Sequence, residues 1–133
     1  MIVVDTNVIA YLYLPTDYTG LAEQLLAKEP DWAAPLLWRS EMRNVLALYL
    51  RKNLLSFDQA YAIQTEAEAL LAPHEYKADS YEVLRLVQNS DCSAYDCEFV
   101  AIAIHLGTRL VTTDKKILQA FPAVAVSLAE AGG

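Results

Sequence analysis

Long apolar runs, clustered cysteines and an excess of positive charge are all missing from this sequence of 133 residues. No apolar run approaches the roughly 20 residues that a membrane-spanning helix needs, and no charged segment followed by an apolar one opens the chain. The two cysteines, Cys92 and Cys97, are spaced unlike a zinc site or a redox pair. We therefore expect a cytoplasmic protein with no membrane segment, in which both cysteines are structural.

The charge balance is acidic, with 10 Lys and Arg residues against 17 Asp and Glu residues and a net charge of −7. A protein that coats nucleic acid by contacting its phosphates is expected to be basic. Two interpretations stay open: the partner is not nucleic acid, or the carboxylates are concentrated where they bind cations. A basic partner protein would also suit this balance.

Short apolar runs alternate with longer stretches of helical periodicity. Strands are predicted at 2–4, 32–36, 74–77, 109–112 and 123–126, and helices at 8–14, 18–28, 38–51, 56–72, 81–88, 94–106 and 115–120. Strands separated by helices need crossover connections and hence a parallel sheet. The sequence thus predicts one α/β domain over residues 1–133, with helices on both faces of a mostly parallel sheet. The terminal residues 131–133 are expected to be frayed.

Two acids directly follow predicted strands. Asp5 comes immediately after the first strand, and Asp114 lies two residues after the strand that ends at Thr112. In a parallel α/β sheet, ligands bind beyond the carboxyl ends of the strands, which is where both acids fall. Each also stands where an aspartate caps the next helix, and for either residue alone capping is the commoner role.

Glu41 lies on a predicted helical face together with Val45 and Leu48. A glutamate within an apolar stripe is costly unless something compensates its charge. Arg39 and Arg43 are each two residues away, whereas same-helix ion pairs form at three or four. A bound cation is the sharper explanation. Both arginines are expected to be solvated helix charges, with contact to a nucleic-acid backbone as the alternative.

Asp96 aligns with Val100 on the core side of a helix that is apolar almost all round. Ser93 and Asp96 also have capping-box spacing, which gives Asp96 a purely local alternative role. Glu98 falls on the more polar face, so we expect it to be solvated or at an interface.

A shared cleft would explain all four acids at once. Converging carboxylates repel each other, and a divalent cation turns that repulsion into binding energy. Oxygen ligands without clustered His or Cys favour Mg²⁺ or Mn²⁺ over zinc. His74 and His105 stand apart from other such ligands, and neither is assigned a catalytic role.

Four segments resemble, in order, the motifs of PIN domains, and the size resembles the VapC-like toxins of bacterial toxin–antitoxin pairs. The segments are Val3-Val4-Asp5-Thr6-Asn7-Val8-Ile9, Ser40-Glu41 with Asn44-Val45-Leu46, Ser93-Ala94-Tyr95-Asp96-Cys97-Glu98-Phe99-Val100-Ala101, and Leu110-Val111-Thr112-Thr113-Asp114-Lys115. The resemblance covers nearly the whole chain.

The resemblance implies a three-layer α/β/α sandwich and Mg²⁺- or Mn²⁺-dependent hydrolysis of RNA, usually by a homodimer that a small antitoxin protein blocks. It implies that the metal-binding and catalytic residues are Asp5, Glu41, Asp96 and Asp114. It implies weaker supporting or substrate-orienting roles for Thr6, Asn7, Ser93 and Thr112.

Two other functions stay open. A non-catalytic PIN-like interaction module would suit the eight tyrosines and two tryptophans, since aromatic residues are common at interfaces. A metal-dependent nuclease could act on DNA, because a metal site contacts the phosphodiester and not the sugar. The presence of all four acids favours an enzyme, because a degenerate module is expected to have lost at least one of them.

Overall fold

A five-stranded parallel sheet forms the centre of the computed structural model, which describes all 133 residues. The strands are β1 (Ile2–Val4), β2 (Trp32–Pro35), β3 (Glu75–Tyr76), β4 (Leu110–Thr112) and β5 (Ala125–Ser127). Their order is β3-β2-β1-β4-β5, and every neighbouring pair is parallel. The predicted parallel sheet is confirmed, with the first strand in the middle.

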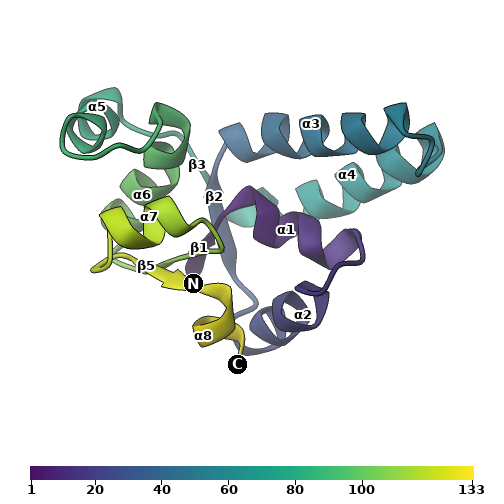
Figure 1. Ribbon diagram of the computed structural model, residues 1–133, viewed down its shortest axis with the longest axis horizontal. Helices are drawn as coiled ribbons and strands as arrows, with labels where there is room; N and C mark the ends of the chain where they lie inside the picture. The colour runs from purple at the N-terminus through teal and green to yellow at the C-terminus, as the bar shows by residue number, and fades with distance from the viewer.

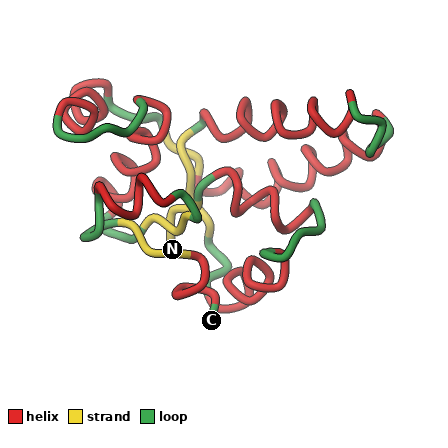
Figure 2. Tube along the Cα trace, viewed as in Figure 1, coloured by secondary structure: helices red, strands yellow, loops and turns green.

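Helices cover both faces of this sheet, as Figures 1 and 2 show. They are α1 (Thr6–Tyr13), α2 (Thr19–Lys28), α3 (Leu37–Arg51), α4 (Phe57–Leu71), α5 (Ser80–Gln88), α6 (Ala94–Leu106), α7 (Lys115–Ala120) and α8 (Leu128–Gly132), with a 3₁₀ turn η1 (Ala72–His74). Helix α6 packs on β1, β2 and β4, and α5 packs on α6. Helices α1 to α4 gather on the opposite side (Figure 1). The three-layer α/β/α sandwich is confirmed.

The hydrophobic core runs continuously through the sheet and both helical layers. All of β1 is buried, as expected for the middle strand of a parallel sheet covered on both faces. Cys92 and Cys97 are free and buried, which confirms that they belong to the core. None of the helices combines the length and apolar composition that a membrane crossing requires.

Local sequence signals fix several helix ends. Ser56 and Gln59 form both halves of a capping box, which starts α4 as predicted. Gly107 ends α6 in the left-handed region with φ 65°, where a residue without a Cβ is favoured. Helix α1 begins at Thr6, two residues before its predicted start, because Asp5 caps it.

The prediction of a frayed C-terminus was wrong, because residues 128–132 form α8, which packs on α2. Ser127 caps this helix by accepting the Glu130 N–H at 3.1 Å. A Cβ added to the buried Gly132 would lie 2.6 Å from the carbonyl oxygen of Leu21. Glycine therefore allows the close approach of α8 to α2, and tertiary packing orders a segment whose composition suggested disorder.

Candidate active site

An open cleft of about 420 Å³ lies beyond the carboxyl ends of β1 and β4. Its lining residues are Asp5, Thr6, Asn7, Leu37, Ser40, Glu41, Asn44, Val45, Tyr95, Asp96 and Asp114. All four predicted acids are in this set, and no Lys or Arg is. The structure thus brings together acids that span 110 positions of the sequence. No basic side chain in the lining of the cleft offsets their charge.

Asp5 is the most buried of these acids, with 9% of its surface exposed. Its Oδ1 accepts the N–H of Thr6 at 2.8 Å, and its Oδ2 accepts the hydroxyl of Thr112 at 2.8 Å. Burial raises the pKa of Asp5, the two hydrogen bonds lower it, and the charges of Asp96 and Asp114 raise it further. The Asp5 side chain therefore both caps α1 and lines the cleft, and its two hydrogen bonds fix its orientation.

Thr112 connects two of the acids from a fully buried position at the end of β4. Besides donating to Asp5, its hydroxyl oxygen accepts the N–H of Asp114 at 3.0 Å. Asp114 caps α7, since its Oδ1 accepts the N–H groups of Lys116 at 2.8 Å and Ile117 at 3.1 Å. Its Oδ2 has no protein partner and is available to a ligand in the cleft.

Glu41 reaches the cleft from α3 and is half-buried. The Thr6 hydroxyl donates to its Oε1 at 2.7 Å. Burial raises the pKa of Glu41, the Thr6 bond lowers it, and charges including that of Asp5 raise it. The predicted apolar stripe does not extend to Leu48, which is 49% exposed. The face that carries Glu41 opens onto the cleft instead of entering the core.

Asp96 presents its carboxylate at the N-terminus of α6. The Ser93 side chain caps this helix by accepting the Asp96 N–H at 3.1 Å. The reciprocal bond of a capping box, between the Asp96 carboxylate and the Ser93 N–H, is absent. Burial and then the charge of Asp114 raise the pKa of Asp96, whereas a hydrogen bond with the Ser93 side chain and the charge of Lys116 lower it. The capping role therefore belongs to the Ser93 side chain, and the Asp96 side chain lines the cleft.

The four weaker candidates divide into three kinds of position. Thr6 and Asn7 line the cleft. Thr112 is buried and forms hydrogen bonds with Asp5 and Asp114. Ser93 caps α6 without lining the cleft. The sequence reasoning assigned no role to other lining residues, namely Ser40, Asn44 and Tyr95. Of these, the place of Asn44 in the cleft could have been predicted, because it lies three residues after Glu41 and therefore on the same face of the helix.

Arg39 is paired with two acidic side chains, so the expectation that it is an ordinary solvated helix charge was wrong. Its Nε and Nη2 donate to the Glu75 carboxylate at 2.6 and 2.7 Å, and its Nη1 donates to Glu68 at 3.0 Å. The buried indole of Trp38 donates to the same Glu75 at 2.8 Å. The Arg39 bonds and the Trp38 bond lower the pKa of Glu75. This network fixes the start of α3 against β3.

The donor set fits a hard divalent cation held partly through water. The structure contains no group of three or more His, Cys, Asp or Glu side chains placed to hold a metal ion together. Mg²⁺ keeps several of its waters in proteins and is commonly bound by one or two carboxylates. Four carboxylates around one cleft can supply direct contacts and hydrogen bonds to such waters.

The fold and the acidic cleft define a PIN-domain protein. The PIN-domain family model matches residues 2–123, and the chain belongs to this family. One relative is Ribonuclease VapC3 of Pyrobaculum aerophilum, which is 29% identical over 126 residues that cover 92% of this chain and 96% of that protein.

Solved structures share the fold at low sequence identity. The crystal structure of FitAcB from Neisseria gonorrhoeae has a TM-score of 0.76 at 18% identity and covers 97% of this chain and 99% of that one. A toxin–antitoxin complex from Klebsiella pneumoniae has a TM-score of 0.72 at 17% identity and covers 96% of this chain and 98% of that one. These similarities support the three-layer architecture.

Proposed function

We propose that this single-domain protein is a Mg²⁺- or Mn²⁺-dependent endoribonuclease that hydrolyses RNA phosphodiester bonds. The observation that carries the proposal is the convergence of four carboxylates, from separate parts of the chain, on one cleft without a basic lining residue. The relative named Ribonuclease VapC3 favours RNA as the substrate class.

The four carboxylates are assigned two kinds of contact with the metal. We assign the most direct contacts to Asp5 and Asp96, and contacts through water or to a second ion to Glu41 and Asp114. When bound, the ion lowers the pKa of a water molecule and offsets negative charge on the phosphate. Hydrogen bonds from Thr112 and Thr6 keep Asp5 in one orientation, so little reorganisation accompanies binding.

Proton transfer is assigned to Glu41. Its Oε1 is held by Thr6, while its Oε2 has no protein partner. Burial and neighbouring negative charges raise its pKa, and a raised pKa makes a carboxylate a better proton acceptor near neutral pH. Glu41 therefore takes the proton of the water that attacks phosphorus.

We further propose that the protein is the toxin of a toxin–antitoxin pair, acts as a homodimer and is blocked by a small antitoxin protein. The net charge of −7 suits a partner with a basic segment. Exposed aromatic residues on α4, with Phe57 at 71% and Tyr61 at 65%, offer apolar surface of the kind that interfaces cover. One protein with the same fold is part of a toxin–antitoxin complex from Klebsiella pneumoniae.

The test incubates the purified protein with structured RNAs and with DNA of the same sequence, with and without Mg²⁺ or Mn²⁺. Cleavage is expected for RNA and only with metal. Asp5→Asn should abolish it, whereas Asp17→Asn, an exposed matched control outside the cleft, should not. Equal cleavage by the wild type and Asp5→Asn would reveal a contaminating nuclease and refute the site. Absence of cleavage by the wild type would favour the interaction module.

A further inference from the structure

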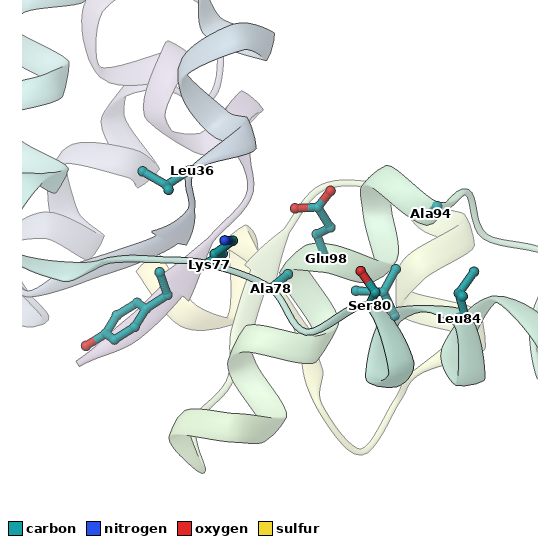
Figure 3. A pocket seen from close by; sticks show the side chains of 9 residues that line it. Leu36, Lys77, Ala78, Ser80, Leu84, Ala94 and Glu98 are labelled. Atoms are coloured by element: carbon teal, nitrogen blue, oxygen red, sulfur yellow. The ribbon is translucent and has the colours of Figure 1, made fainter.

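A second pocket of about 320 Å³ lies between the end of β3 and helices α5 and α6. Its walls are mostly apolar and include Leu36, Val83, Leu84 and Ala94. In Figure 3 the Glu98 carboxylate stands between Leu36 on one side and Leu84 on the other. Pockets of this size and composition, with a few polar groups, typically bind small ligands or parts of larger ones.

This pocket lies next to the acidic cleft. Leu36 and Ala94 line the pocket, and the residues that follow them in the sequence, Leu37 and Tyr95, line the cleft. Glu98 is also close enough to Glu41 for its charge to act on that side chain. A nucleotide next to a phosphate in the cleft therefore lies within reach of the pocket.

Two charged groups in the pocket have no partner within the protein. Glu98 is half-buried and accepts no hydrogen bond from any side chain, and neither Glu98 nor Lys77 takes part in an ion pair. A half-buried carboxylate among apolar side chains is costly without donors. The pocket thus presents a half-buried acceptor with two oxygens and a donor from the exposed Lys77.

We propose that this pocket binds a guanine base next to the scissile phosphate, with Glu98 as the residue that selects it. Guanine presents two adjacent donors, N1–H and the N2 amino group, which match the two oxygens of a carboxylate. Its neighbouring O6 is an acceptor, which suits the Lys77 ammonium group. Adenine, cytosine and uracil each place an acceptor where Glu98 needs a donor. The inference rests on the proposed function, since it names the nucleotide preference of the same site.

The first test measures kcat/KM on short RNAs with one variable nucleotide beside the cleavage site: guanosine, inosine, 2-aminopurine or adenosine. Inosine lacks the N2 amino group and 2-aminopurine lacks N1–H. We expect guanosine to exceed adenosine by about tenfold or more, with the two analogues between them, because a polar site rejects a ligand that leaves its groups unpaired. Glu98→Gln should reduce the guanosine-to-adenosine ratio, and the exposed matched control Glu23→Gln on α2 should keep it.

The second test follows binding of the nucleosides guanosine and adenosine by NMR without metal, so that neither phosphate repulsion nor cleavage contributes. Guanosine should shift the signals of Leu36 and Leu84, and Glu98→Gln should remove the shifts. Guanosine shifts without RNA cleavage would support the pocket and refute the proposed function. RNA cleavage without nucleotide preference would overturn the guanine assignment and leave the nuclease standing. Equal shifts with both nucleosides would also overturn it.

Discussion

The Thr112 hydroxyl is the most informative single group to remove, because it bonds two of the four cleft acids from a fully buried position. Thr112→Val replaces the hydroxyl by a methyl group of similar size. The substitution leaves the Asp5 Oδ2 without its donor and the Asp114 N–H without its acceptor. It tests at once whether the network stabilises the fold and whether it positions the acids.

The expected cost follows from the two lost bonds. A hydrogen bond to a charged group contributes about 1.5 to 3 kcal/mol, and a buried donor left unsatisfied costs about 1 to 3 kcal/mol. The additional buried methyl group returns about 1 kcal/mol. We therefore expect Thr112→Val to lower the free energy of unfolding by about 3 kcal/mol. Thr112→Ser keeps the hydroxyl and loses one buried methyl group, so it should cost only about 1 kcal/mol.

Urea denaturation with EDTA present measures these differences, and a Mg²⁺ titration followed by thermal unfolding measures the effect on metal binding. Loss of a group that orients a metal ligand typically weakens affinity by about 10- to 100-fold. Thr112→Val should show that loss and Thr112→Ser should not. Equal stability and equal Mg²⁺ response of the two variants would refute the argument that the hydroxyl holds Asp5 and Asp114.

Three further expectations follow from other parts of the structure. Asp5→Asn should lose the stabilisation by Mg²⁺ that the wild type shows in thermal unfolding, because it removes the carboxylate charge at a position that we assign to the metal. Glu75→Gln should cost about 2 kcal/mol at neutral pH. Arg39 lowers the pKa of Glu75 below its ordinary value of 4.5. The stability difference between the wild type and Glu75→Gln is therefore complete above pH 4.5 and disappears as the pH falls through the lowered pKa. Urea titrations at several pH values measure it. Gly132→Ala should lower the melting temperature, because its Cβ meets the Leu21 carbonyl oxygen; an unchanged melting temperature would contradict the packing of α8 on α2.

The sheet and most helices could be predicted because their signals are local. Strand β1 is an uninterrupted apolar run, Ser56 and Gln59 mark the start of α4, and Gly107 marks the end of α6. Helix α8 had no such signal apart from Ser127, because its order depends on contact with α2. Composition alone does not reveal a contact between segments about 100 residues apart.

The acids could be predicted because the strand ends dictate where two of them lie. Asp5 and Asp114 follow β1 and β4, which are neighbours in the sheet, so their proximity follows from the topology. The argument that placed Glu41 beside the other acids rested on an incorrect premise, since its helical face opens to the cleft and does not enter the core. The Arg39 network was not predictable, because its partner Glu75 lies 36 residues away and on a different element.

Helix capping and ligand binding were weighed as competing explanations of the same aspartates, but the structure makes them compatible. A carboxylate has two oxygens with about four acceptor positions. At Asp114, Oδ1 takes both helix N–H groups and leaves Oδ2 free, and at Asp96 a separate residue, Ser93, does the capping. Capping fixes the orientation of Asp114 before any ligand arrives. Replacing Asp114 by Asn should therefore keep the cap and the stability of α7 while weakening Mg²⁺ binding, whereas Asp114→Ala should lose both.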